Sequence, residues 1–313
     1  MPERIPIIIR RFFALICARV GIIAVSVKIN AVVSCVIENA VKNYADTAFF
    51  RFRYKQIERL VAADDSIKGI WCVPKYSNPE GIIYSKDTIV RMASMKPAAP
   101  DFTIMWDNAY CIHEFDGDYV EFPDILHQCK KYGNYDMVYE FASTSKITFP
   151  GDGVACMATS EANLEDFEKW IGIQTISYDK VNQQRHVLYL QNRAHTLKLM
   201  KKHAAFMKPK FEAVLSTLDR EIAPLEIASW SHPKGGYFVS FDAMPGTAKR
   251  TLALCKEAGV AMTAAGATFP YGIDPNDSNI RIAPSFPPVE DVEKAIAVFC
   301  TCVKMSALEK LGV

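Results

Sequence analysis

Four short polar motifs carry the side chains of this sequence that are best suited to chemistry. They are Asn78-Pro79-Glu80-Gly81, Asp107-Asn108-Ala109-Tyr110, Ser143-Thr144-Ser145-Lys146 and Asn279-Ile280-Arg281. Each motif alone has an ordinary structural explanation, because Asn-Pro turns, aspartates after strands and lysines in Ser/Thr loops are common. Together and in this order they supply a carboxamide, a carboxylate, a phenol, an amine and a guanidinium.

These groups match what pyridoxal 5′-phosphate chemistry on amino acids requires. An amine must attach the cofactor, and a carboxylate must keep the pyridine nitrogen protonated so that the ring withdraws electrons. A guanidinium can then bind a substrate carboxylate through two parallel hydrogen bonds. We therefore predict Lys146 as the Schiff-base lysine and proton carrier, Asp107 as the partner of the ring nitrogen, and Arg281 as the ligand of the substrate carboxylate.

Longer stretches of the chain resemble the class I/II (fold type I) aminotransferases, and within them the bacterial aspartate aminotransferase-like subgroup. The resemblance runs from about Tyr54 to the C-terminus. The stretches that carry it are Trp71 to Pro79, Phe141 to Ala155, Lys180 to His186, Pro233 to Phe238 and Ile280 to Pro287. It implies a cytoplasmic homodimer that moves an amino group between amino acids and 2-oxo acids, with aspartate and 2-oxoglutarate as the expected pair, by a ping-pong mechanism.

The same resemblance assigns further site residues. Tyr110 and Asn78 would bind the phenolic oxygen of the cofactor, and Asn78 would also lie at the substrate. The hydroxyl groups of Ser143 and Ser145 would bind the phosphate, with Ser143 the better match for direct contact. The resemblance does not identify the group that binds the side-chain carboxylate of the substrate, for which Lys180 and Arg185 are weak candidates.

Two positions depart from the family pattern. Many class I members carry an arginine eight residues after the lysine, where this chain has Val154. The glycine-rich Gly151-Asp152-Gly153 precedes it, and its backbone N–H groups could bind an anion instead. Glu80 replaces the threonine of the usual Asn-Pro-Thr-Gly, which a turn should tolerate. The phosphate site is therefore the part of the pattern that the sequence supports least.

Composition narrows the possible partners. The chain has 36 basic and 35 acidic residues and a net charge of +1, so neither nucleic acid nor an anionic membrane is an expected partner. The nine cysteines include no Cys-x-x-Cys pair and the six histidines no His-x-x-x-His pair. We expect reduced, packed thiols in a cytoplasmic protein and no metal site.

The hydrophobic pattern predicts an α/β fold with a smaller C-terminal α+β domain, and the resemblance implies that this fold is of type I. Four short apolar strands are expected at 69–73, 103–106, 137–141 and 154–157, with helices near 54–64, 85–96, 121–132 and 161–172. This alternation predicts a mostly parallel sheet whose carboxyl ends hold the active groups. After a connector helix at 180–207, the second domain is expected to contain helices at 208–222, 247–258 and 289–310 and strands at 236–241 and 280–283.

The predicted domains are an unplaced segment at 1–53, a partial large domain with its connector at 54–205, and a small domain at 206–313. Residues 1–53 show no family motif. Three interpretations are open: an unusual folded segment, a membrane-associating leader, or sequence from a wrong start or shifted reading frame. We favour the last. The large domain is thus expected to be N-terminally incomplete, without the usual phosphate loop and ring-stacking aromatic.

Three other functions are weighed against transamination. A truncated, non-catalytic chain with weak or no cofactor binding is the main alternative. A transcription regulator would need a helix-turn-helix that the N-terminal segment lacks. Another pyridoxal 5′-phosphate reaction, such as β-elimination, is compatible with the same residues.

Overall fold

The computed structural model describes residues 23–24, 47–116 and 119–313 of the chain. The described residues form two compact units. The first unit contains the residues up to Lys75, Ile83–Ile112 and Tyr119–Met200, and the second contains Tyr76–Ile82, 113–116 and Lys201–Val313. Most of the predicted N-terminal segment, 1–53, lies outside the described residues.

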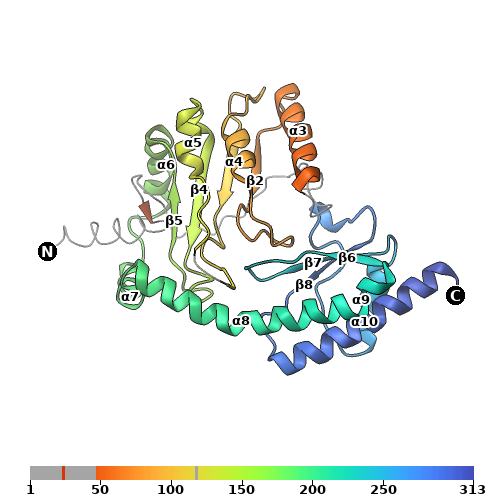
Figure 1. The fold of residues 1–313 in the computed structure, drawn as a ribbon. Coiled ribbons are helices and arrows are strands. Elements are labelled where there is room, and N and C mark those ends of the chain that lie inside the picture. The colour runs from red at the N-terminus through yellow and green to blue at the C-terminus, as the bar shows by residue number, and fades with distance from the viewer. Residues whose placement is uncertain (1–22, 25–46, 117–118) are drawn as a thin grey trace. The chain divides into compact units, whose positions relative to one another are not determined.

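The first unit is built on a five-stranded sheet with the strand order β1-β5-β4-β3-β2 (Figure 1). The strands are β1 (Ile23–Ala24), β2 (Gly69–Cys72), β3 (Thr103–Asp107), β4 (Val138–Ser143) and β5 (Ala155–Ala158). Strands β2, β3 and β4 are parallel, whereas β5 runs antiparallel to β4 and β1 antiparallel to β5. The predicted α/β class is confirmed, and Asp107 and Ser143 end neighbouring parallel strands at the same edge of the sheet.

Among the described residues, five α-helices belong wholly to the first unit. They are α3 (Thr47–Ala63), α4 (Lys86–Ala93), α5 (Ile125–Lys131), α6 (Glu161–Gln174) and α7 (Lys180–Leu190). Four of them begin after a capping side chain that accepts a backbone N–H of the first turn, namely Ser85, Asp124, Ser160 and Asp179. The prediction that α5 starts near residue 121 is wrong, because Asp124 caps the helix and fixes its start at Ile125.

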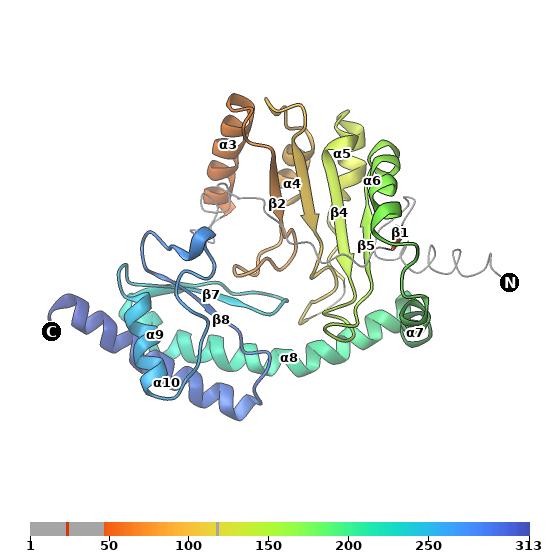
Figure 2. The ribbon, with the colours of Figure 1, turned by 180° about the vertical axis from the view of Figure 1, so that it is seen from behind.

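The helices of the first unit lie against its sheet (Figure 2), and the main core of this unit lies between them. Alternate residues of β2 and β3 are buried, as expected for strands whose side chains point to opposite faces in turn. The cluster includes Ile70, Ile104, Trp106 and Val138 from the strands and Ile57, Val61, Ile89, Met92 and Ile125 from the helices. Full burial of such a side chain contributes about 1.5–3 kcal/mol, so this cluster fixes the strand ends that carry the polar motifs.

Helix α8 (Arg193–Glu221) passes from the first unit into the second. The prediction that a helix ends near residue 207 is wrong. Pro209 lies inside α8, and the break falls earlier, where Gln191 has a φ of 55° and caps the end of α7. A positive φ is sterically unfavourable for a residue with a side chain, so the chain cannot continue as a helix through Gln191.

The second unit contains an antiparallel sheet with the order β6-β7-β8. Its elements are β6 (Ala228–Trp230), β7 (Val239–Ala243), β8 (Asn279–Ile282), α9 (Ala248–Glu257) and α10 (Val289–Leu311), with short 3-10 turns at Ala223–Leu225 and Pro270–Gly272. The rings of Phe241 and Phe299 meet edge to face, with centroids 5.0 Å apart, and join β7 to α10 in the core.

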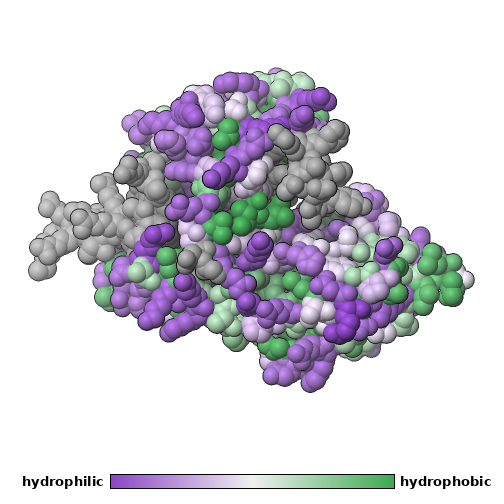
Figure 3. Space-filling model, in the orientation of Figure 1, coloured by the Kyte–Doolittle hydropathy of each residue, from purple (hydrophilic) through white to green (hydrophobic). Residues whose placement is uncertain are grey.

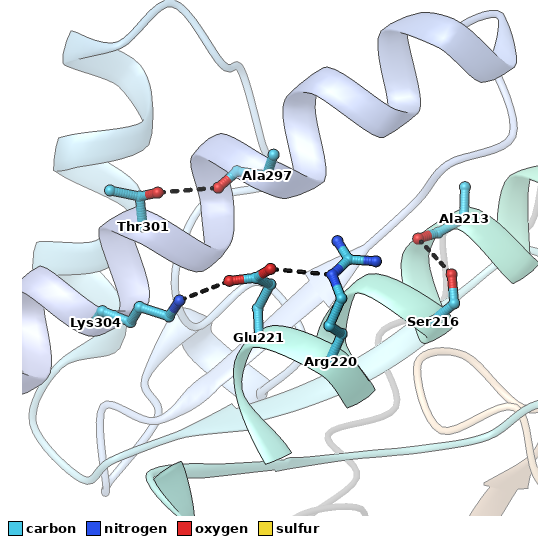
Figure 4. Close-up of polar contacts among 7 residues, drawn as sticks. All are labelled: Ala213, Ser216, Arg220, Glu221, Ala297, Thr301 and Lys304. Carbon is cyan, nitrogen blue, oxygen red and sulfur yellow. Dashed lines mark hydrogen bonds and ion pairs between the residues drawn. The ribbon is translucent and has the colours of Figure 1, made fainter. Parts of the chain in front are cut away.

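Helices α8 and α10 are also linked at the surface (Figure 4). Lys304 donates to a carboxylate oxygen of Glu221 at 2.8 Å, and the neighbouring Arg220 donates to the other oxygen at 3.0 Å. These partly exposed ion pairs contribute little stability, so the packing depends on the buried face of α10. Apolar side chains are exposed at the C-terminal end of α10, where Leu311 is 62% exposed (Figure 3).

Two lysines of the described residues are buried, one in each unit. Lys75 is 0% exposed, and its ammonium group donates to the carbonyls of Cys111 and Val120 at 2.8 and 2.9 Å. Lys210 is 1% exposed and donates to the carbonyl of Ser285 at 2.8 Å. Backbone carbonyls thus replace part of the hydration that each ammonium group loses, as a buried charge requires.

In the part of the chain that the structure describes, the seven free cysteines are all buried. Within the described ranges, no group of three or more His, Cys, Asp and Glu side chains is placed to hold a metal ion. Of the helices there, none is both long enough and apolar enough to cross a bilayer.

Candidate functional site

Lys146 lies in the loop that connects the antiparallel strands β4 and β5. Thr144 begins a helical turn, because its carbonyl accepts the backbone N–H groups of Ile147 and Thr148, both at 2.8 Å. Thr144 and Ile147 are fully buried, whereas Lys146 between them is exposed. The two buried neighbours therefore hold the turn in place while the amine of Lys146 stays accessible.

Asp107 is the last residue of β3 and is half-buried. Its carboxylate accepts hydrogen bonds from the Trp71 side chain and from the Ala109 backbone N–H. Burial raises the pKa of Asp107, while the charge of Lys146 and these two hydrogen bonds act in the opposite direction. The carboxylate is therefore close enough to interact with Lys146, and its charged form would be stabilised by a further cation.

Tyr110 brings an aromatic ring to the same place. It is buried, and the ammonium nitrogen of Lys146 lies 4.9 Å from the centroid of its ring. At this distance a cation and a ring attract one another. The first unit thus gathers Lys146, Asp107 and Tyr110, three residues that the sequence analysis selected for their chemistry.

The predicted phosphate-binding serines lie around the same turn. The hydroxyl oxygen of Ser143 accepts the backbone N–H of Ser145 at 3.4 Å, and both residues are partly exposed. Gly153 packs so closely on this turn that a Cβ there would lie 2.2 Å from the Ser145 hydroxyl. Val154 is buried in an apolar cluster, so no cation replaces the arginine of the common pattern at that position.

Sequence reasoning missed a histidine that braces the lysine loop. His186 on α7 is buried, and its Nε2 lies 2.9 Å from the hydroxyl of Thr148, while Nδ1 lies 2.9 Å from the carbonyl of Asn182. Asn182 in turn donates to the carbonyl of Asp152 at 2.7 Å. The stretch from Lys180 to His186, which carries part of the resemblance, therefore holds both sides of the loop around Lys146.

Arg281 and Asn78 meet in the second unit. Arg281 lies on β8 and donates from Nη1 to the side-chain oxygen of Asn78 at 3.1 Å, and its guanidinium lies 4.7 Å from the centroid of the Phe238 ring. Its buried Nε has no hydrogen-bond partner among the described residues. No described carboxylate lies within ion-pairing distance of it, so the guanidinium retains donors for an anion.

The Asn78 segment is held in the second unit by glycines. A Cβ on Gly81, whose φ is +69°, would lie 2.5 Å from the Cβ of Pro233. A Cβ on Gly235 would lie 2.5 Å from the ring of Tyr76. The Pro233 to Phe238 stretch therefore leaves room for the segment from Tyr76 to Ile82, which local patterns in the sequence do not indicate.

The predicted site residues thus form two sets, each within its own unit. In the first unit the structure places Lys146, Asp107, Tyr110, Ser143 and Ser145 around the ends of β3 and β4. In the second unit it joins Asn78 to Arg281. Lys180 is exposed at the start of α7 and Arg185 is exposed on the same helix, and neither contacts the described residues of the lysine loop.

Comparisons with known proteins agree on one family. A family model described as aspartate amino-transferase matches residues 53–313. A relative from Mycolicibacterium smegmatis is 49% identical over 255 residues, which cover 82% of this chain and 60% of the relative. An aspartate aminotransferase of Corynebacterium glutamicum is 43% identical over 253 residues, which cover 81% of this chain and 58% of that protein.

Solved structures show the same similarity. The crystal structure of an aspartate transaminase from Corynebacterium glutamicum superposes with a TM-score of 0.81 at 42% identity, covering 82% of this chain and 60% of that one. The α-aminoadipate aminotransferase LysN of Thermus thermophilus, at 20% identity and a TM-score of 0.67 over 81% of this chain and 62% of its own, shares the fold. The chain spans about 60% of the length of the curated relatives that it matches.

Proposed function

The chain belongs to the aspartate aminotransferase family, and from that membership we propose that it transfers an amino group from aspartate to 2-oxoglutarate with pyridoxal 5′-phosphate as its cofactor. The observation that carries the proposal is the grouping of the Lys146 amine with the Asp107 carboxylate and the Tyr110 ring. We further propose that the active protein is a cytoplasmic homodimer, as the family resemblance implies.

The residues of the first unit fit this cofactor. Burial raises the pKa of Asp107 although Lys146 is near, so a protonated pyridine nitrogen would supply the additional positive charge that its carboxylate form needs. Lys146 has an exposed amine to attach the cofactor, and Tyr110 has a phenol beside it. Ser143 and Ser145 would bind the phosphate with their hydroxyl groups, without help from the buried Val154.

When bound, the cofactor supplies an electron sink that stabilises negative charge on the substrate α-carbon. Asp107 would keep the ring nitrogen protonated. Lys146 would be the base that removes the α-proton and later returns a proton. Burial of Thr144 and Ile147 on either side limits the movement of Lys146 between these two tasks.

Arg281 and Asn78 would orient the substrate. The unpaired Nε of Arg281 and its remaining donors can bind the α-carboxylate as a bidentate pair, which is stronger and more directional than a bond to a single donor. Asn78 holds the guanidinium through its side-chain oxygen and retains its N–H₂ group for the phenolic oxygen of the cofactor. Such fixed orientation selects which bond of the α-carbon is broken.

The test is an absorbance titration of the purified full chain with pyridoxal 5′-phosphate, followed by aspartate. We expect a visible band from lysine-bound cofactor that Lys146→Ala abolishes. Lys169→Ala is the matched control, because Lys169 is an exposed lysine of α6 that pairs only weakly with Asp166 at 3.6 Å. Aspartate should then convert the cofactor to its pyridoxamine form and release oxaloacetate.

Two other results would contradict the proposal. A band that persists in Lys146→Ala would reject Lys146 as the attachment site. Cofactor binding without conversion by aspartate, or no binding at all, would favour the alternative of a chain that keeps the motifs without catalysing transamination. That alternative draws on one observation, the apolar burial of Val154 where many relatives carry a phosphate-binding arginine.

A further inference from the structure

Glu80 takes part in a polar network of the second unit that the proposed function does not use. The hydroxyl of Ser240 on β7 donates to a carboxylate oxygen of Glu80 at 3.1 Å. The side-chain N–H₂ of Asn279 on β8 donates to the same hydroxyl at 3.0 Å and to Asp242 at 2.9 Å. Asn279 and Ser240 are 2% exposed, so these bonds are shielded from water.

Each hydrogen bond of this network has a defined donor and acceptor. Thr268 donates to the side-chain oxygen of Asn279 at 2.7 Å, which fixes the orientation of that amide. The amide then has two N–H donors, one for Ser240 and one for Asp242. Because Ser240 has a single proton and accepts from Asn279, it donates that proton to Glu80. An acceptor at position 80 therefore completes the chain of hydrogen bonds.

The network lies directly beside Arg281 in the sheet. Ser240 is the residue paired with Arg281 across the antiparallel strands β7 and β8. Asn78, which accepts from Arg281, is only two residues from Glu80 in the same loop. The loop is thus fastened to two paired residues of the sheet, through Glu80 on Ser240 and through Asn78 on Arg281.

The orientation of Arg281 depends on this loop. Among the described residues no carboxylate holds the guanidinium, and Asn78 supplies its side-chain hydrogen bond. Asn78 itself is exposed, so packing does not fix its side chain. The contact of Gly81 with Pro233 secures the far end of the loop independently, which means that removing the Glu80 bond should leave the loop folded.

We propose that Glu80 is a positioning residue: by accepting the Ser240 hydroxyl, it holds the loop so that Asn78 presents Arg281 to a substrate carboxylate. The inference rests on the proposed function in one respect, the role of Arg281 as the carboxylate ligand. It gives a specific role to the residue by which this chain departs from Asn-Pro-Thr-Gly.

The experiment measures binding of succinate, an unreactive dicarboxylate, to the full chain by titration calorimetry at one fixed concentration of pyridoxal 5′-phosphate. We expect Glu80→Ala to weaken binding about tenfold, equivalent to about 1.4 kcal/mol. Glu80→Gln should bind nearly as wild type does, because its amide oxygen also accepts from Ser240. Glu293→Ala, at an exposed position of α10, is the matched control for loss of a carboxylate.

The Ser240 side provides the second arm. Ser240→Ala should weaken succinate binding in the same direction as Glu80→Ala does, and the double variant should be no weaker than Glu80→Ala alone, because Ser240 acts through the bond that Glu80→Ala has already removed. Ser229→Ala, at an exposed position of the neighbouring strand β6, controls for loss of a strand hydroxyl. With aspartate as substrate, Glu80→Ala should raise KM about tenfold and leave kcat within about twofold.

The results of these experiments distinguish the positioning role of Glu80 from the proposed function itself. Loss of succinate binding in Arg281→Ala together with unchanged binding in Glu80→Ala overturns the inference and leaves the proposed function standing. Additive effects of Glu80→Ala and Ser240→Ala also overturn it. If wild type does not bind succinate, or if Arg281→Ala binds it equally well, the role of Arg281 is rejected and the positioning role falls with it.

Discussion

Two carboxyl groups on the sheet of the first unit show how neighbouring groups change the effect of burial on a carboxyl pKa. Asp107 at the end of β3 has Lys146, Trp71 and the Ala109 N–H to offset the cost of burying its charge. Glu140 on β4 accepts a single hydrogen bond from Asn108, at 3.3 Å, and burial raises its pKa to about 8. At neutral pH we therefore expect Glu140 to be mostly protonated, whereas Asp107 has three partners that favour its carboxylate form.

Glu140 should make the fold less stable as the pH rises. Its pKa is about 8 in the folded chain and near the ordinary value of 4.5 in the unfolded chain, so the folded state binds the proton more tightly. The contribution of Glu140 to stability is then largest below about pH 4.5 and falls until about pH 8. Glu140→Gln removes this loss, and its advantage in free energy of unfolding should grow by a few kcal/mol between pH 5 and pH 8.5.

Urea unfolding at the two pH values measures this difference. Glu293→Gln, which neutralises an exposed carboxylate on α10, should show much less change with pH relative to wild type. A constant difference between wild type and Glu140→Gln across this range would mean that Glu140 is ionised in the folded protein throughout.

At the scale of elements, the sequence predicted the positions of those helices and strands that depend mainly on local interactions. Hydrophobic patterns placed β3 and β8 within one residue at each end, because a strand that borders a core buries apolar side chains on at least one of its faces. The antiparallel direction of β5 was not predictable, since pairing depends on contacts distant in sequence. Strand β6 was missed because Ala228, Ser229 and Trp230 form no apolar run. The helix boundary predicted near residue 207 was wrong, because α8 continues through Pro209.

The lysine loop offers a test at this scale through Gly153. A Cβ at this position would lie 2.2 Å from the Ser145 hydroxyl and 2.9 Å from its Cα and backbone nitrogen. Backbone atoms cannot move aside as a flexible side chain can, so Gly153→Ala should displace the turn that carries Lys146. We expect affinity for pyridoxal 5′-phosphate, measured by absorbance titration, to fall at least tenfold, about 1.4 kcal/mol.

Gly172→Ala is the matched control for that substitution. Gly172 lies in α6 with nothing within 4 Å of an added Cβ, and alanine favours a helix over glycine by about 1 kcal/mol. The control should bind the cofactor normally and be slightly more stable. Normal cofactor affinity in Gly153→Ala would show that the turn can shift without consequence for Lys146.

At the scale of the whole molecule, the chain has two units with separate hydrophobic cores. Motif spacing identified side chains on both, because each motif follows a strand end or lies on a strand. It did not show that the segment from Tyr76 to Ile82 packs with residues more than 150 positions later. It also missed His186 and Glu80, whose partners become apparent only once the chain is folded.

All the proposed cofactor ligands except Asn78, namely Lys146, Asp107, Tyr110, Ser143 and Ser145, belong to the first unit, so the cofactor should stabilise that unit. At one hundred times its dissociation constant a ligand adds about 2.7 kcal/mol. Trp230 is the tryptophan of the second unit, so fluorescence of Trp230→Phe reports the first unit alone. Its melting temperature should rise with pyridoxal 5′-phosphate, and Lys146→Ala should remove most of the rise.

The buried ammonium groups of Lys75 and Lys210 have a consequence for chemical modification. Both are enclosed and bonded to backbone carbonyls, so brief acylation of the native chain should leave them unreacted, whereas the exposed Lys146 should be acylated. Pyridoxal 5′-phosphate should protect Lys146. Peptide mapping would then measure the fraction of Lys146 that is acylated, with the buried Lys75 and Lys210 as unreacted references. Acylation of Lys75 would show that the chain had unfolded at least locally.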